Sequence, residues 1–319
     1  MEMAAIKSFN DREEQLLRQI SSLDIRIEQM KKMATLPTNV RVKVEALKKN
    51  QLELLQIEAD YHRKVFAVEQ HFQPMYNELY EKRRQLVTGA YVPSEMELAA
   101  APDDAADQSK GIPEFWLTVF RMTPVLQSMI RAVDEEPLKR LVDVRVVIND
   151  EPQPGFDLVF EFEPNEFFND RILKKKYMMR CAPNTDKPAT FNGYEIFDTI
   201  GQTIDWKDGK DLTKLTMTEE SGLKREVPTN SFFNFFDPKK LFESEPLLSI
   251  TLLETDFEIG YYIKEQVVPR AVFLFTGEAE DELESDETSS RDGSLCGACK
   301  LSAHSENEAQ ENEDSNNVM

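Results

Sequence analysis

Residues 38–88 constrain the fold of this chain more than any other stretch. They contain a single proline, Pro74, and no glycine. Apolar side chains recur there with a period of 3.5 residues, which is the heptad pattern of one long helix with an apolar seam. At a rise of about 1.5 Å per residue the helix would reach roughly 75 Å, longer than a small domain is wide. Gly89 and Pro93 predict where it ends.

Most of this seam cannot be covered by the same chain. The simplest cover is the same helix of a second copy, which predicts a homodimer. The alternative is a long helix folded back onto other helices of its own chain, but a sustained heptad pattern favours the dimer. The seam residues that we assign to dimerisation are Val40, Val44, Leu47, Leu54, Tyr61, Val65, Val68, Phe72, Met75 and Leu79.

The charge balance restricts the partners that this chain can bind. Its 319 residues include 59 acidic and 38 basic side chains, which gives a formal net charge of −21. Such a balance disfavours nucleic acid as a direct partner and favours a basic one. The length allows one or two domains with a sizeable core.

Three features indicate a soluble protein of the nucleus or cytoplasm. The first ten residues are mixed and polar, so we expect no secretory signal peptide. No apolar run approaches the length that spans a bilayer, so we expect no membrane partner. The three cysteines do not suggest a disulfide framework, which favours a reducing compartment.

The sequence divides into regions of different composition. Residues 11–33 place apolar side chains near helical spacing, and a proline separates this amphipathic helix from the long one. The stretch before Gly111 is rich in alanine, proline and aspartate, as in a mobile linker. We expect five regions: an N-terminal amphipathic helix (1–35), a long dimerisation helix (36–91), a flexible acidic linker (92–111), an α/β domain (112–277) and an acidic tail (278–319).

Period-two alternation predicts an antiparallel sheet in the α/β domain. Apolar and polar side chains alternate over 142–148 and again over 156–162, across a turn rich in proline and glycine. The fold class is therefore α+β: a long dimerisation helix plus an antiparallel β-sheet domain with helices packed on one face. Further strands are expected at 175–181, 214–218 and 223–227, and helices at 113–133 (bent or divided by Pro124), 232–242 and 256–275.

The C-terminal segment loses its hydrophobic residues from Glu278 onward. Residues 278–319 contain 13 acidic and 2 basic side chains, so they carry −11 of the total of −21. A segment with this much charge and so few apolar residues cannot bury enough surface to fold, and we expect a disordered acidic tail.

The sequence offers little for catalysis or metal binding. Cys296 and Cys299 form a lone CxxC with His304 nearby, which leaves zinc one ligand short. A loop that loosely suggests phosphate binding has Asp211 where serine or threonine should bind magnesium. We therefore expect no enzyme, no catalytic residue, no metal and no cofactor. The lysine run at 174–176 is interpreted as the solvated start of a strand.

Seven stretches carry a family resemblance and cover nearly everything from 36 to 279. They are LPTNVRVKVEALKKNQLEL (36–54), FQPMYNELYEKRRQLVTGAY (72–91), GIPEFWLTVF (111–120), QPGFDLVFEFEPNEFF (153–168), TIDWKDGKDLT (203–213), VPTNSFFNFFDP (227–238) and DFEIGYYIKEQVVPRAVFLFTGEA (256–279). In these blocks and in their order, the chain resembles the nucleosome assembly protein family of histone chaperones.

The resemblance implies a fold and a function. Members of this family form dimers through a long helix, carry α/β domains that form an arch, and have an acidic C-terminal tail. They bind core histones, shield them from DNA, and promote nucleosome assembly and disassembly without a cofactor or covalent chemistry. For this chain the resemblance implies a homodimeric histone chaperone of the nucleus and cytoplasm, with core histones as partners and no direct contact with nucleic acid.

The resemblance also implies which side chains bind histones. These are acidic residues on the underside of the α/β domain and in the tail, where carboxylates compete with DNA phosphates for lysines and arginines. The positions are Asp134, Glu135, Glu136, Glu243, Glu245, Asp256, Glu258, Glu278, Glu280, Asp281, Glu282, Glu284, Asp286 and Glu287.

One feature departs from the family pattern. Members commonly carry a long basic insertion between the strands near 214 and 227, where this chain has only TMTEESGLKREVP. We therefore expect neither nuclear import through that insertion nor assemblies larger than a dimer. The alternative function is an acidic scaffold or inhibitor that binds a phosphatase or transport partner, because some relatives act in that way.

Overall fold

A computed structural model gives the structure of the protein, and it describes residues 21, 23–91, 93, 111–150, 152–218, 224–237 and 246–279. The first part of the expected N-terminal helix, most of the linker and nearly all of the acidic tail lie outside these residues. The turn of the second expected hairpin and the end of the helix expected at 232–242 also lie outside them.

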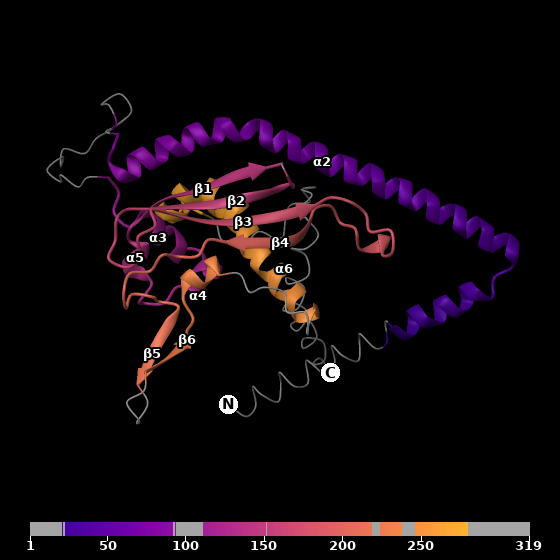
Figure 1. Ribbon diagram of the computed structural model, residues 1–319. Coiled ribbons are helices and arrows are strands. Elements are labelled where there is room, and N and C mark those ends of the chain that lie inside the picture. Colours follow the sequence, from indigo (N-terminus) through magenta and orange to yellow (C-terminus); the bar gives the residue numbers. More distant parts are fainter. Residues whose placement is uncertain are drawn as a thin grey trace, which may run out of the picture. The chain divides into compact units, whose positions relative to one another are not determined.

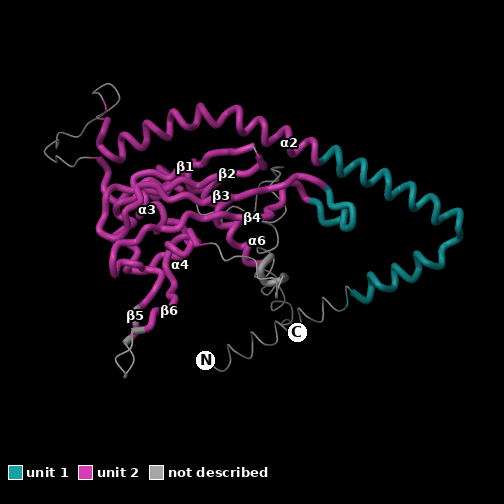
Figure 2. Tube along the Cα trace, in the orientation of Figure 1, with its two compact units in different colours: residues 1–58, 183–191 teal, residues 59–182, 192–319 magenta. Residues whose placement is uncertain are grey.

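The chain separates into two compact units, which Figure 2 shows in different colours. Unit 1 comprises residues 1–58 and 183–191, and unit 2 comprises residues 59–182 and 192–319. The boundary falls within the long helix, so this helix contributes to both units. Unit 2 contains the β-sheets and the described acidic positions that are candidates for binding a partner.

The long helix α2 spans Thr38–Thr88, as the heptad pattern predicts. It starts beside Pro37, whose carbonyl accepts a hydrogen bond from the Val40 amide at 2.9 Å. The helix continues through Pro74 and ends before Gly89, whose φ of 69° lies in the left-handed region that favours glycine. Local sequence therefore sets both ends of this 51-residue helix.

Four antiparallel strands form the main sheet, in the order β1-β2-β3-β4 (Figure 1). The sequence-based predictions of the first three are confirmed, but the sequence pattern did not predict β4. A bulge in β4 inserts Phe197 between Ile196 and Asp198, which places two apolar residues side by side and breaks the alternation. The strands are β1 (Leu141–Asn149), β2 (Gly155–Phe162), β3 (Ile172–Arg180) and β4 (Glu195–Gly201).

The second predicted hairpin forms a separate two-stranded sheet. It consists of β5 (Lys214–Thr218) and β6 (Lys224–Pro228), and it does not extend the main sheet. Leu215 and Met217 expose more than half of their surface.

The helices of unit 2 differ from the predictions in their boundaries. Pro124 divides the segment 113–133 into two helices, because it starts the second at its first position. The helix predicted from residue 256 begins at Pro246, since the stretch 247–253 is mostly apolar, without charged residues, and gives no periodic start signal. The elements are α3 (Phe115–Arg121), α4 (Pro124–Met129), α5 (Glu135–Leu138), the 3₁₀ helix η2 (Phe232–Phe236), α6 (Pro246–Tyr262), the π-helical segment η3 (Ile263–Val267) and α7 (Val268–Thr276), with the 3₁₀ turn η1 (Pro188–Thr190) in unit 1.

An aromatic core joins the sheet to these helices. Phe156 and Phe160 point to one face of β2 and are fully buried. Phe160 meets Phe236 of η2 edge to face, with ring centres 5.1 Å apart. Tyr177 of β3 packs so closely on Gly260 of α6 that a Cβ at residue 260 would lie 2.3 Å from the Tyr177 ring carbon Cζ. The helices therefore pack on one face of an antiparallel sheet, as the alternation predicts.

Candidate functional site

The residues assigned to dimerisation form an exposed apolar stripe on α2. Eight of the ten are exposed, from 40% at Val65 to 68% at Leu47, and Val40 and Val44 are half-buried. A different side of the same helix is buried, because Phe66 packs against Tyr194 with ring centres 5.1 Å apart. The helix thus has one apolar side covered by its own chain and one that this single chain leaves open.

Asp134 is buried, and its carboxylate makes its hydrogen bonds within the chain. Its carboxylate accepts hydrogen bonds from the Ser231 hydroxyl at 2.6 Å, the Phe232 amide at 3.0 Å and the Arg131 amide at 2.9 Å. The carboxylate holds the start of η2 against the turn before α5. We therefore correct the sequence-based assignment and leave Asp134 out of the proposed histone-binding surface.

Glu135 and Glu136 lie on the surface in the first turn of α5. Glu135 pairs with Arg121 at 2.6 Å, and Glu136 pairs with Lys139 at 2.6 Å. Exposed pairs of this kind stabilise a protein by about 0–1 kcal/mol, so a basic partner can exchange with them. Both carboxylates remain candidates for contact with a partner.

Asp256 is engaged by a buried lysine. Lys175 stands at a core-facing position of β3 and is completely buried. Its ammonium donates to the carboxylate of Asp256 on α6 and to the Phe235 carbonyl of η2. The ammonium also lies 3.8 Å from the centre of the Phe235 ring. The interpretation of residues 174–176 as solvated is therefore wrong for Lys175.

Burial dominates the electrostatics of this pair. Loss of hydration lowers the pKa of Lys175 and raises the pKa of Asp256, and the charge of each partner opposes the shift. The Tyr177 hydroxyl adds a hydrogen bond to the main-chain carbonyl of Asp256 at 3.0 Å. We therefore assign Asp256 to holding α6 on β3 and leave it out of the proposed histone-binding surface.

Glu258 stays on the surface of α6, where Glu254 lies one turn earlier. Partial burial raises the pKa of Glu258, and the charge of Glu254 adds to this rise. No described lysine or arginine forms an ion pair with either carboxylate. Like charges four residues apart destabilise a helix slightly, so a basic side chain from a partner would relieve the repulsion.

The remaining acidic positions are mostly outside the described residues. Glu278 is described and exposed. The other predicted positions that the structure does not describe are Glu243, Glu245, Glu280, Asp281, Glu282, Glu284, Asp286 and Glu287.

A second buried carboxylate lies where α2 meets β1. Asp143 is completely buried, and its Oδ2 lies 2.9 Å from Nε of Arg145. The charges of Arg83 and Arg84 on α2 also act on it, and that of Glu161 opposes them. Burial outweighs the arginines and raises the pKa of Asp143 from its ordinary value of 3.8 to about 6.

This raised pKa predicts how stability depends on pH. The folded chain binds the Asp143 proton more tightly than the unfolded chain, so the contribution to the unfolding free energy is largest below pH about 4 and falls as pH rises to about 6. The total change is about 2–3 kcal/mol. Denaturant unfolding from pH 4 to 7 should show a smaller fall in the Asp143→Asn variant than in the wild-type protein. If the unfolding free energy falls equally with pH in both proteins, the pKa of Asp143 is not raised by its burial.

The described part of the chain lacks two kinds of feature. It contains no helix that combines the length and the apolar character needed to cross a bilayer. It also contains no group of three histidine, cysteine or acidic side chains placed to hold a metal ion. The CxxC at 296–299 lies outside the described residues.

The fold defines a class of protein. A long helix followed by a four-stranded antiparallel sheet with helices on one face also occurs in a solved nucleosome assembly protein 1 from Plasmodium knowlesi. The TM-score is 0.54 at 28% identity, over 76% of this chain and 99% of that one. A solved malaria parasite nucleosome assembly protein gives a TM-score of 0.50 at 25% identity, over 77% of this chain and 100% of that one.

The sequence comparison identifies the family. The model of the nucleosome assembly protein (NAP) family matches residues 42–278, and the chain belongs to this family. It is 37% identical over 285 residues to human nucleosome assembly protein 1-like 1, which covers 79% of this chain and 73% of the relative. It is 38% identical over 285 residues to mouse nucleosome assembly protein 1-like 4, which covers 78% of this chain and 76% of the relative.

Sequence reasoning missed the surface carboxylate Glu254 and the buried Lys175. Glu254 precedes Glu258 by four residues, a spacing that places two side chains on one helical face. Lys175 stands two residues before Tyr177 in a strand of period two, so alternation alone puts it on the core-facing side. Both signals were present in the sequence.

Proposed function

We propose that this chain is a histone chaperone that binds core histones through acidic surfaces and promotes nucleosome assembly and disassembly. The observation that carries the proposal is membership of the nucleosome assembly protein family over residues 42–278. The net charge of −21 supports a basic partner. The proposed places of action are the nucleus and the cytoplasm.

The proposed mechanism is competition for basic side chains. Histones bind DNA by neutralising phosphates with lysine and arginine. Carboxylates of the chaperone occupy the same side chains and suppress wrong contacts, but they yield to DNA when a correct nucleosome forms. This function requires neither a cofactor nor a covalent step.

The proposed histone-binding surface combines folded and tail carboxylates. In the described part we retain the surface carboxylates, add Glu254 and omit Asp134 and Asp256, which are engaged within the chain. The set is Glu135, Glu136, Glu254, Glu258 and Glu278, together with the sequence-assigned Glu243, Glu245, Glu280, Asp281, Glu282, Glu284, Asp286 and Glu287.

We also propose that the chaperone acts as a homodimer joined through α2. The exposed stripe from Val40 to Leu79 supports this proposal, because soluble chains rarely leave so many large apolar residues in contact with water. A second copy of the same helix offers a self-complementary cover.

One experiment distinguishes the histone chaperone from the alternative function, an acidic scaffold or inhibitor that binds a phosphatase or transport partner. Purified protein, core histones and DNA are mixed at physiological salt, and nucleosomes are counted by native gel and nuclease protection. A histone chaperone increases the yield of correctly spaced nucleosomes over histones and DNA alone. An acidic scaffold without chaperone function gives no increase.

Removing the tail is expected to weaken histone binding only about 3–10-fold. Residues 278–319 carry −11, but single ion pairs in contact with solvent are individually weak and screened by salt. The folded surface loses less entropy on binding and keeps most of the affinity. Labelled histone dimer and tetramer are titrated at several salt concentrations. The histone affinity of a chain truncated after Gly277 should depend less on salt than that of the full chain.

The matched control compares pairs of charges. Neutralising Glu254 and Glu258 with glutamine should cost more affinity than neutralising Glu311 and Glu313 in the tail, although each variant removes two charges. If the truncated chain loses all histone affinity and the Glu254 and Glu258 variant binds histone like the wild type, the tail is the binding site.

A further inference from the structure

The two edges of the main sheet differ in how they are covered. At the β1 edge, Gln73 of α2 donates to the Val146 carbonyl at 3.2 Å, and the Trp116 indole donates to the Val142 carbonyl at 3.1 Å. Helices therefore close this edge to another strand. The other edge is formed by β4 (Figure 1).

The outward main chain of β4 has no strand partner within the described part of the molecule. The Gln202 amide donates to Lys174 at 2.9 Å, and antiparallel alternation then turns Ile200 toward β3 and turns Thr199 and Gly201 outward. The Thr199 amide donates instead to the side chain of the adjacent Asp198 at 2.8 Å. No described strand pairs with this edge.

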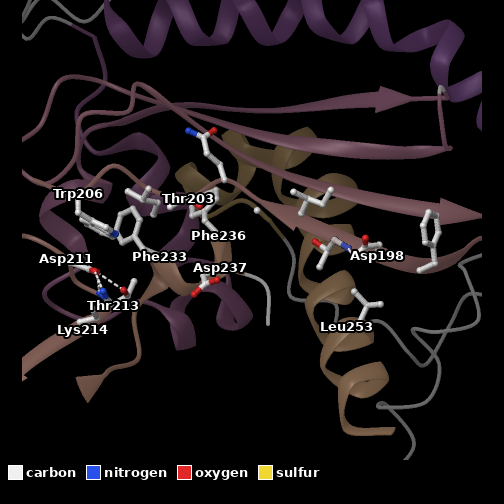
Figure 3. A pocket seen from close by; sticks show the side chains of 16 residues that line it. Asp198, Thr203, Trp206, Asp211, Thr213, Lys214, Phe233, Phe236, Asp237 and Leu253 are labelled. Atoms are coloured by element: carbon white, nitrogen blue, oxygen red, sulfur yellow. Dashed lines mark hydrogen bonds and ion pairs between the residues drawn. The ribbon is translucent and has the colours of Figure 1, made fainter. Parts of the chain in front are cut away.

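A groove of about 850 Å³ runs along this edge. We call it the β4 groove; its walls are β4 with the following residues to Ile204, the start of β5, η2 and Leu253 of α6. Figure 3 shows Trp206 and Phe233 together at one end, Leu253 at the other, and Asp237 between them. The groove therefore combines an open strand edge with apolar anchor points.

The charge of the β4 groove is negative. Asp198, Asp211 and Asp237 line it, against the single described cation Lys214. Lys214 is already paired with Asp211 at 3.5 Å and with Glu226 at 3.4 Å. The carboxylates Asp198 and Asp237 are exposed. An occupant of this groove must therefore be basic.

We propose that the β4 groove binds an extended basic peptide segment of a partner protein, which adds to the β4 edge as a further strand. Main-chain hydrogen bonds to the Thr199 carbonyl and to the amide and carbonyl of Gly201 provide affinity, and an apolar side chain rests on Trp206 and Phe233. Alternate basic side chains face the carboxylates. The proposal rests on the proposed function only in that histones would be the source of such a segment.

Strand addition is tested with synthetic peptides. The probe is a fluorescent ten-residue peptide that alternates lysine and valine, and binding to the full chain is measured by anisotropy. Two derivatives carry N-methyl groups on either the odd or the even amides. Only one set of amides faces β4, so one derivative should bind like the parent and the other at least about 10-fold more weakly. Equal binding of all three peptides would overturn the proposal.

Charge variants locate the peptide on the chain. The double variant Asp198→Asn and Asp237→Asn should weaken the parent peptide about 3–10-fold. Asparagine keeps an acceptor for the Thr199 amide, so the strand stays intact. The matched control neutralises two exposed acids that do not line the groove, Glu163→Gln and Glu166→Gln. An equal loss in the control would show diffuse attraction and would overturn the assignment.

A parallel titration with histone distinguishes failure of this inference from failure of the proposed function. Intact histone dimer is titrated against the same groove and control variants. Binding of histone together with equal binding of all three peptides refutes the β4 groove but leaves the chaperone function standing. Binding of the parent peptide in the groove without any binding of histone refutes the chaperone function and supports a different basic partner.

Discussion

Replacing Asp256 by alanine is expected to destabilise the folded chain by about 3–5 kcal/mol, because the variant leaves the Lys175 ammonium buried without its counter-charge. Burial lowers the pKa of Lys175, and in the wild-type protein the charge of Asp256 opposes this shift. Chemical denaturation followed by circular dichroism measures the effect.

Two further variants make this expectation specific. Replacing the pair together, Lys175→Met with Asp256→Leu, should recover most of the lost stability, since an apolar pair of similar volume needs no hydration. Glu258→Ala, on the exposed side of the same helix, should change stability by less than about 0.5 kcal/mol. An Asp256→Ala protein as stable as the wild type would show that the pair does not hold α6 on the sheet.

The second large effect concerns the exposed stripe of α2. Replacing Val65 and Val68 with aspartate should abolish the proposed homodimer, because four carboxylates would be buried in one interface without counter-charges. Sedimentation velocity should show monomer at micromolar concentration. Both side chains are exposed in the single chain, so unit 2 should keep its fold, as circular dichroism would show.

The control variant is Lys64→Asp. It changes the net charge by the same amount and lies on an exposed position outside the predicted seam. It should sediment like the wild type. If the Val65 and Val68 variant also sediments as a folded dimer, the stripe is not the interface.

Local sequence predicted those elements whose signals are local. The bounds of α2 agree with the heptad pattern, because Pro37 and Gly89 delimit it. The hairpin of β1 and β2 follows from the alternation of apolar and polar side chains at most of its positions. β4 lacks that alternation because of its bulge at Phe197, and the bulge depends on the register with β3. Such a feature is set by a neighbouring strand and has no local signature.

The candidate site was harder to predict because the role of a carboxylate depends on distant partners. Asp134 meets Ser231, which is 97 positions away, and Asp256 meets Lys175, which is 81 positions away. Both were assigned to the surface from the family resemblance. Nothing near either residue in the sequence distinguishes a carboxylate that holds two elements together from one that faces a partner.

The positions of the two tryptophans give the molecule two separate optical reporters. Trp116 is buried beside the Arg83 guanidinium, 4.9 Å from the ring centre, where α2 meets β1. Trp206 is half-buried in the β4 groove, edge to face with Phe233 at 5.4 Å. The chain contains no third tryptophan. Intrinsic fluorescence therefore reads the docking of the long helix from one indole and the occupancy of the groove from the other, without any added label.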